Sequence, residues 1–424
     1  MKEQVKQIKE GIKLHVIPTD KFKTNLLAVF ITLPLKRENV TKDALLPAVL
    51  RRGSKKLSSQ EEISKFLENM YGASFDCGVE KTGDNHVLKF YLEALNDSYL
   101  PKPENLIKTS IDALLEIVFN PYQENGKFKE DFVNSEKINL KQIIESKIDS
   151  KDLYAIVRCT EEMYKGQPYS LYKYGYVEDL EQITAENLYE HYEQVIKTAK
   201  IDIFVSGNFS ADEVIKLVQE NENCNKIQAR KAEYHVNNEQ TEKKEAKPEQ
   251  IKEEKMDVAQ GKIVIGLDIL ESDLESRFVA VLYNTILGDS ANSKLFQNVR
   301  EKAHLAYSTR SSYIKPKNTI FIRAGIEIEN YEKALEIIRQ QLEEMKNGNF
   351  SEEELENAKK YIISAVDSIA EEQDTEITYY LGQELSASSY TPEEYKQKIE
   401  AVSKEQIVQI AGKVSINTIF FLRN

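Results

Sequence analysis

The sequence predicts an α+β protein made of two homologous sandwich domains, each an antiparallel sheet packed against helices. Three observations lead to this fold class. Apolar strand patterns precede long amphipathic helices in both halves of the chain. Antiparallel strands with helices grouped after them are typical of a sandwich. The order of elements recurs after roughly 220 residues, which indicates a tandem duplication rather than a solenoid.

Composition limits the classes of function. The chain has 424 residues, enough for two domains with their own cores, and its 41% hydrophobic and 30% charged residues are typical of a globular protein. A net charge of −13 argues against a general nucleic-acid or anionic-membrane surface. We see no apolar segment of a signal peptide or membrane span. The cysteines Cys77, Cys159 and Cys224 form no C-x-x-C pair, so we expect a reduced, cytoplasmic protein with inert thiols.

The first half begins with two apolar stretches, residues 11–18 and 25–35, on either side of a polar turn, and this pattern predicts a β-hairpin. Ser59 and Glu62 form a capping box that opens a helix. After this helix we expect two strands, at residues 73–79 and 86–95. Two helices are expected at residues 107–119 and 132–164, and a further strand at residues 201–206.

The second half repeats this order. We expect a strand at residues 262–270 and two helices at residues 275–287 and 293–300. Two strands are expected at residues 308–313 and 319–328, and a helix at residues 331–345. Another long helix is capped by Ser351, and an apolar strand is expected near the C-terminus. Between the halves, residues 236–255 mix both charges and are almost free of apolar side chains, which predicts an exposed linker. The predicted domains are therefore residues 1–235 and 256–424.

One segment of the second half carries a long motif. Residues 283–307 read Tyr-Asn-Thr-Ile-Leu-Gly-Asp-Ser-Ala-Asn-Ser-Lys-Leu-Phe-Gln-Asn-Val-Arg-Glu-Lys-Ala-His-Leu-Ala-Tyr. A helix that ends in Leu-Gly, followed by Ser-x-Leu-Phe, Arg-Glu-Lys and Leu-Ala-Tyr, resembles the signature of the M16 metallopeptidase family. This family includes pitrilysin, insulin-degrading enzyme and the mitochondrial processing peptidase.

The first half resembles the same family. Gly53-Ser-Lys-Lys precedes the Ser59-capped helix, and Asn120-Pro is followed by Phe132-Val-Asn-Ser-Glu-Lys. The resemblance covers nearly the whole chain and implies two similar α+β domains. In two-domain members of the family, two such chains close like a clamshell around an unfolded peptide.

The resemblance shows where the family's zinc motif would lie in this chain, and the residues at those positions differ from the motif. In the family, two histidines of a His-x-x-Glu-His helix bind zinc, and the glutamate is the base for a zinc-bound water. Counting back from Gly53 puts the histidines at Ala44 and Ala48 and the base at Pro47. None of these residues binds zinc or activates water, and a proline also disturbs the hydrogen bonding of a helix.

The remaining parts of the zinc site are also missing. The family's distal glutamate ligand falls on or near Ile143, and the nearby Glu145 cannot hold zinc alone. No histidine lies between His15 and His86, so no shift of the alignment restores the motif. We therefore expect no metal or other cofactor in this chain, which is not a self-contained peptidase, and zinc only in a partner.

Arg300 and Tyr307 match a pair that the family uses to bind the substrate carbonyl and stabilise the tetrahedral intermediate. A guanidinium and a phenol can both donate to a developing oxyanion. The family's pair lies in the second type of domain and, in two-chain members, reaches the zinc of the other chain. The alternative is a structural role, with Arg300 in an ion pair and Tyr307 packed in the sheet.

Two functions remain open. The chain is either the inactive subunit of a heterodimeric bacterial peptide-processing peptidase, where it donates Arg300 and Tyr307 to a zinc-bearing M16 partner, or a peptide-binding scaffold homodimer without a role in hydrolysis. In both cases the peptide pairs with a strand edge, at residues 73–79 or 86–95. No P-loop, nucleotide fingerprint or Ser-His-Asp set indicates another class of enzyme.

Overall fold

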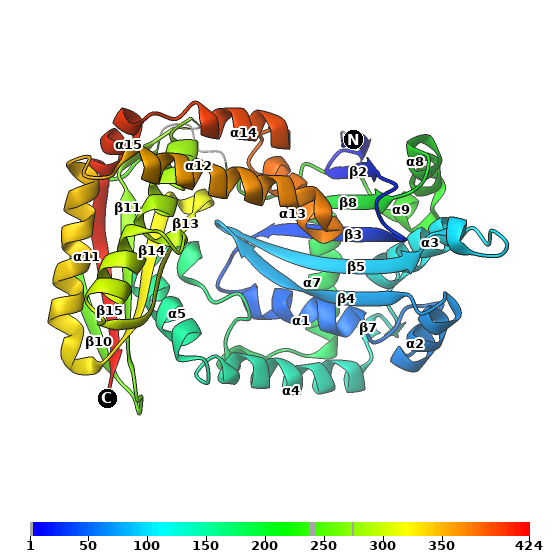
Figure 1. The fold of residues 1–424 in the computed structure, drawn as a ribbon. Helices are drawn as coiled ribbons and strands as arrows, with labels where there is room; N and C mark the ends of the chain where they lie inside the picture. Colours follow the sequence, from blue (N-terminus) through cyan, green and yellow to red (C-terminus); the bar gives the residue numbers. More distant parts are fainter. Residues whose placement is uncertain (1–2, 238–241, 274) are drawn as a thin grey trace. The chain divides into compact units, whose positions relative to one another are not determined.

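The computed structural model describes residues 3–237, 242–273 and 275–424, and it divides into two compact units (Figure 1). The segments of unit 1 are Met1–Ser146, Leu171–His235 and Gln373–Leu381. The segments of unit 2 are Lys147–Ser170, Val236–Glu372 and Gly382–Asn424. Each unit contains one large, mainly antiparallel sheet with helices packed on it, so the predicted α+β class is confirmed.

Unit 1 is built on a six-stranded sheet with the order β1-β2-β8-β3-β5-β4. The strands are β1 (Gln4–Lys9), β2 (Ile12–Pro18), β3 (Thr24–Pro34), β4 (Ser74–Thr82), β5 (Asn85–Leu95) and β8 (Lys200–Gly207). The predicted hairpin of β2 and β3 is wrong, because β8 lies between them, parallel to β2 and antiparallel to β3. Every residue of β8 is buried, and a buried strand needs hydrogen-bonding neighbours on both edges.

The helices of unit 1 form its core with one face of this sheet. They are α1 (Val40–Leu50), α2 (Gln60–Asn69), α3 (Leu106–Phe119), α4 (Glu130–Ser146), α6 (Val177–Leu180), α7 (Ala185–Thr198), α8 (Ala211–Glu220) and α9 (Glu222–Lys226). The side chain of Ser59 accepts a hydrogen bond from the backbone N–H of Glu62 and so caps α2, as predicted. Alternate strand residues point into this core, where Leu88 of β5 packs with Leu114 of α3.

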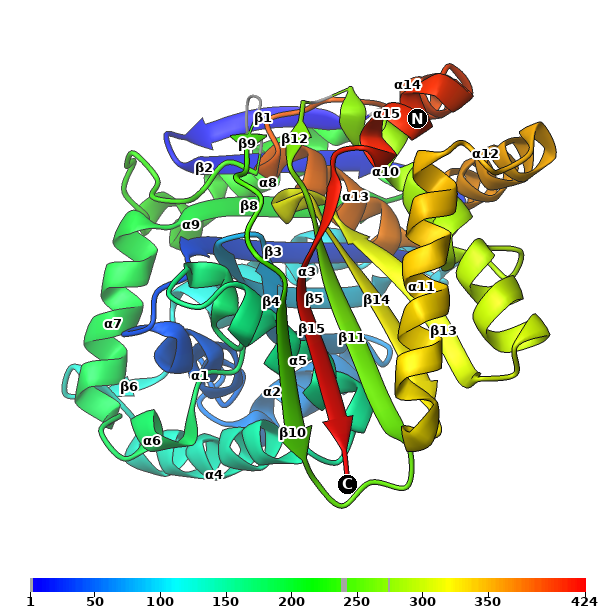
Figure 2. The same cartoon turned by 90° about the vertical axis from the view of Figure 1, so that its left-hand side faces the viewer.

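Unit 2 repeats the same topology on a five-stranded sheet with the order β10-β15-β11-β14-β13. The strands are β10 (Gln250–Lys255), β11 (Gly261–Ile269), β13 (Ala306–Ile314), β14 (Thr319–Ile326) and β15 (Val414–Arg423). β15 is parallel to β10 and antiparallel to β11, and Figure 2 shows β10, β15 and β11 side by side. In unit 1, β8 has the same relation to β2 and β3. The predicted duplication is therefore present in the order and direction of the strands.

The helices of unit 2 pack on one face of its sheet in the same way. They are α10 (Ser276–Asn284), α11 (Tyr331–Lys346), α12 (Glu352–Asp367), α14 (Pro392–Glu400) and α15 (Lys404–Ala411). Ser351 and Glu354 form the predicted capping box at the start of α12. No helix among the described residues of either unit is long and apolar enough to cross a bilayer.

The predicted linker, residues 236–255, contains regular structure. β9 (Glu242–Lys243) pairs with β12 (Glu271–Ser272), and β10 occupies the position in unit 2 that β2 occupies in unit 1. Residues 238–241 lie outside the described part of the chain. The strand was missed because β10 is an edge strand with mostly exposed side chains, so a charged sequence is compatible with its backbone pairing.

The units also differ from the predicted domains, because each half of the sequence contributes residues of one helix to the unit that is built mainly from the other half. The predicted helix at residues 132–164 is two helices, α4 in unit 1 and α5 (Lys151–Met163), which belongs to unit 2. α5 packs on β11 and β15, where Cys159 contacts Val264. In return, the first residues of α13 (Gln373–Leu385) belong to unit 1, where Nε2 of Gln373 donates to the carbonyl of Ser206 at 3.0 Å. These helices cover the second face of each sheet.

Candidate functional site

Helix α1 holds the three positions at which the family resemblance places the zinc motif. Ala44 and Pro47 are buried, and Ala48 is half-buried. The helix continues through Pro47, although proline has no N–H to donate to the carbonyl of Asp43. Nine of the eleven residues of α1 are buried, so tertiary packing compensates for the missing hydrogen bond. The side chains at these three positions have no atom that binds zinc.

Helix α4, which packs against α1, carries the distal position. Ile143 is 44% exposed, and Nζ of Lys141 lies 3.9 Å from the carboxylate of Glu145. Arg52, just after α1, donates through Nε to Glu136 of α4 and ties the two helices together. Across the described ranges, no three His, Cys, Asp or Glu side chains are placed to hold a metal ion. The groups that join α1 to α4 are therefore an ion pair and apolar contacts.

A buried carboxylate with two histidines stands beside the lost motif. Nε2 of His191 in α7 lies 2.6 Å from Oδ1 of Asp43, and Nδ1 of His86 in β5 lies 3.5 Å from Oδ2. Burial alone would raise the pKa of Asp43, but the interactions with both histidines outweigh it and hold this pKa below its usual value. Sequence reasoning missed this cluster, because positions 43, 86 and 191 have no spacing that signals a contact.

Arg300 lies in the π-helical segment η4 (Phe296–Lys302) of unit 2. Its guanidinium carbon is 4.7 Å from the ring centroid of Phe296, and Nε is 3.7 Å from a carboxylate oxygen of Glu301. The side chain is 44% exposed, and an ion pair at such a distance on the surface is weak. The guanidinium donors are therefore accessible to a ligand.

Tyr307 lies at a bulge in β13, which is an edge strand of the unit 2 sheet. Its neighbours Ala306 and Ser308 pair with adjacent residues of β14, so Tyr307 is the extra residue of the strand. Tyr307 is 62% exposed and does not pack in the sheet, and its hydroxyl donates to Oε1 of Glu327. This hydrogen bond to a carboxylate raises the pKa of Tyr307, so the phenol stays protonated at neutral pH.

The predicted site residues fall into two groups. Ala44, Pro47, Ala48 and Ile143 belong to unit 1, and Arg300 and Tyr307 belong to unit 2. Within unit 2, η4 leads into β13 through His304, whose backbone has a left-handed φ of 54°. The N–H of His304 donates to the carbonyl of Arg300 at 3.1 Å, and this bond fixes the turn between the pair.

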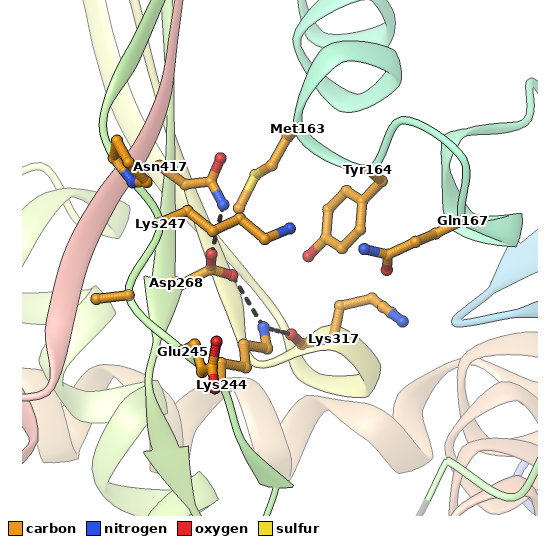
Figure 3. Close-up of a pocket in the computed structure, with 11 residues that line it drawn as sticks. Met163, Tyr164, Gln167, Lys244, Glu245, Lys247, Asp268, Lys317 and Asn417 are labelled. Atoms are coloured by element: carbon orange, nitrogen blue, oxygen red, sulfur yellow. Dashed lines mark hydrogen bonds and ion pairs between the residues drawn. The ribbon is translucent and has the colours of Figure 1, made fainter.

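A polar pocket of about 420 Å³ in unit 2 is drawn in Figure 3. Nζ of Lys244 lies 3.0 Å from Oδ1 of Asp268 and donates to the carbonyl of Lys317 at 2.5 Å, while Nδ2 of Asn417 donates to Oδ2 of Asp268 at 2.6 Å. Both oxygens of Asp268 are therefore engaged. These bonds anchor the segment that contains Lys244 to the sheet and engage the carboxylate of Asp268.

Comparisons with known proteins agree with the motifs. The family model described as Peptidase M16 inactive domain matches residues 182–362. The chain is 35% identical to the Bacillus subtilis (strain 168) protein named "Probable inactive metalloprotease YmfF" over 417 residues, or 97% of this chain and 96% of that protein. It is 24% identical to the "Uncharacterized zinc protease YmxG" of the same organism over 314 residues, or 72% of each.

A solved structure shows the same fold over the full length. The crystal structure of a conserved protein from Enterococcus faecalis V583 superposes with a TM-score of 0.90 at 28% sequence identity, covering 100% of this chain and 99% of that one. Together with the 35% identity to the Bacillus subtilis relative over nearly the whole of both chains, these findings show that the chain belongs to the M16 peptidase family.

Proposed function

We propose that this chain is the non-catalytic subunit of a heterodimeric M16 peptidase whose other subunit binds the zinc ion. The partner contributes the metal and the activated water, and this chain contributes Arg300 and Tyr307 as donors to the substrate carbonyl oxygen. The observation that carries the proposal is the exposure of Tyr307, 62% accessible at a bulge of an edge strand. The positions of the zinc motif, in contrast, have only alanine and proline side chains.

The two side chains have the chemistry that an oxyanion requires. A phenol is protonated at neutral pH, so Tyr307 has a proton to donate. A substrate carbonyl replaces Glu327 as its acceptor, and the interaction strengthens as negative charge develops on the carbonyl oxygen. Arg300 offers a fork of N–H donors from a side chain that is 44% exposed.

The sheet of unit 1 offers a place for the peptide. Of the two candidate strands, β4 lies at the edge of the sheet and β5 lies inside it, paired on both sides. Only an edge strand has backbone groups that can pair with an added chain, so we propose β4 as the strand that holds an extended peptide. Backbone pairing of this kind tolerates many peptide sequences.

The names of the relatives fit a division of labour between two chains. One relative is named as an inactive metalloprotease and another as a zinc protease. A zinc-bearing member of the family is therefore a partner of the required chemistry.

The test uses the assembled pair. The full chain serves as bait for a zinc-bearing M16 partner from the native cell, and the purified pair is assayed on an unstructured fluorogenic peptide. We expect Arg300→Ala and Tyr307→Phe each to lower kcat/KM by about 100-fold, the usual effect of removing one oxyanion donor. Zinc analysis should find one ion per pair.

Two matched variants serve as controls. Lys302→Ala removes another exposed cation of η4, and Tyr361→Phe removes another exposed phenol, so both should leave turnover unchanged. Unchanged turnover of the Arg300 and Tyr307 variants with intact assembly would rule out the donation of these groups. Purification as a homodimer that does not bind the zinc-bearing chain would favour the scaffold function.

A further inference from the structure

Unit 1 contains a cavity that the proposed peptidase role does not use. Its volume is about 710 Å³, within the range of small-molecule sites. The cavity lies between the C-terminal end of α3, one face of α7 and the segment that follows α9. The apolar and aromatic residues that line it include Phe119, Pro121, Tyr189, Tyr192, Ile196 and Ile227.

The apolar wall is held in place before any ligand binds. Tyr189, Tyr192 and Ile196 follow one another at helical spacing on a single face of α7. The hydroxyl of Tyr192 donates to the carbonyl of Val118 at 3.0 Å, which fixes this ring. The ring of Tyr189 packs edge-on against Phe128, with the two centroids 5.2 Å apart.

The charged residues around the cavity are mostly positive. Lys55, Lys197, Lys226 and Arg230 line it together with one carboxylate, Glu193, so four cations face one anion. The whole chain has a net charge of −13, which makes this excess of cations unusual for its surface. Nζ of Lys197 lies 4.0 Å from Glu193, a distance at which an exposed ion pair is weak. The cavity is therefore electrostatically complementary to an anion.

Arg230 has a donor that lacks an acceptor. Its Nε donates to the carbonyl of Ala199 at 3.0 Å and its Nη1 to that of Gln228 at 3.1 Å. Nη2 is buried and has no hydrogen-bond partner among the described residues. Burial lowers the pKa of Arg230 to about 10, so the group is still charged at neutral pH. Buried polar groups are almost always paired, and Arg230 lines the cavity, so an anion bound there could supply the acceptor that Nη2 lacks.

We propose that this cavity binds a small organic anion with an apolar body, of the class of a medium-chain carboxylate. The body lies against Tyr189, Tyr192 and Ile196, and the anionic group meets Arg230 and the lysines at the rim. This function goes beyond the proposed peptidase role and requires neither zinc nor a partner chain.

The test compares a charged probe with its neutral analogue on the full chain. Anilinonaphthalene sulfonate and N-phenylnaphthylamine share their aromatic body, but only the first has an anionic group. In equilibrium dialysis we expect one sulfonate probe per chain, bound about tenfold more tightly than the neutral one, a difference of about 1.4 kcal/mol. Decanoate should displace the sulfonate probe, and decanol should not.

Variants locate the bound probe. Arg230→Met, and separately the double variant Lys55→Met/Lys197→Met, should weaken sulfonate binding by about tenfold, or about 1.4 kcal/mol, and leave binding of the neutral probe unchanged. The double variant changes only exposed side chains, so it remains informative if Arg230→Met fails to fold. Lys216→Met on α8 is the matched control, because Lys216 is an exposed cation that does not line the cavity.

The proposal is wrong if both probes bind equally, or if sulfonate binding survives in a folded double variant. Equal displacement by decanol would show an apolar patch without selectivity for anions. Displacement by an acidic peptide and not by decanoate would show a site for a protein partner instead.

Discussion

The hydroxyl of Tyr307 donates a hydrogen bond to the carboxylate of Glu327, the residue that directly follows β14. This contact joins the bulge of β13 to the end of the neighbouring strand. In the proposed peptidase role, a substrate carbonyl would replace this acceptor. Glu327 therefore raises the pKa of Tyr307 and accepts its hydroxyl proton in a hydrogen bond.

Replacing this acceptor should change the titration of the phenol. In Glu327→Gln the neighbouring negative charge is lost, so the pKa of Tyr307 should fall from its raised value toward the ordinary 10.0. The measurement is the pH dependence of the tyrosine Cζ carbon resonance, assigned with Tyr307→Phe. Glu329→Gln, an exposed neighbour, should leave the resonance unchanged. An unaltered pKa in Glu327→Gln would contradict the contact.

The buried carboxylate beside the lost zinc motif should stabilise unit 1. Asp43→Asn removes the charged acceptor of His191 in a fully buried site, and we expect a loss of about 2 kcal/mol in the free energy of unfolding at pH 7. The folded pKa of Asp43 is below its ordinary value of 3.8, so this stabilisation is present above pH 3.8 and is lost as the pH falls through the folded pKa.

Urea unfolding from pH 7 to pH 3 measures this effect. The difference between the parent chain and Asp43→Asn should shrink only at the acidic end. Asp149→Asn, an exposed aspartate between α4 and α5, should show no such difference. A difference that is constant over the whole range would show that the cost comes from packing rather than charge.

The buried His15 should stabilise unit 1 with a pH dependence opposite to that of Asp43. Nδ1 of His15 lies 2.6 Å from Glu3 and Nε2 lies 3.2 Å from Asp202, and the ring stacks on Phe204. Burial lowers the pKa of His15, but the two carboxylates raise it by a larger amount, so the net pKa lies above the ordinary 6.5. The stabilisation is therefore complete below pH 6.5 and is lost as the pH rises through the folded pKa.

The effect of His15 is measured as the difference in unfolding free energy between the parent chain and His15→Gln. We expect this difference to be larger at pH 5.5 than at pH 9, because only the charged imidazole interacts strongly with both carboxylates. A difference that grows with pH would show that the ring is neutral in the folded protein.

The three thiols should be unreactive in the folded protein. Cys159 and Cys224 are buried, and burial raises the pKa of each. Cys77 is half-buried, and burial raises its pKa to about 12. Because the thiolate is the reactive form, we expect no rapid reaction with a disulfide reagent at pH 8 and three reacting thiols after unfolding in urea. A rapidly reacting native thiol would show that its segment opens.

Local patterns predicted most of the elements and the part of the site that depends on residue type. The positions of β2, β3 and α12 were visible from apolar periodicity and from the caps of the helices. The pairing partners of β2 and β3 were not visible, because a polar turn between two strands shows only that they are consecutive and not that they form a hairpin. β8 comes from a distant part of the sequence and takes the place between them.

By itself, the sequence determined that the chain has the motifs of the M16 family and that Ala44, Pro47 and Ala48 offer no zinc ligand, because these are properties of residue type. Only the tertiary structure decided which groups meet: Asp43 with His191, Tyr307 with Glu327, and α5 with the sheet of unit 2. These contacts join residues far apart in the chain, and they form because buried charges need partners and both faces of a sheet need cover.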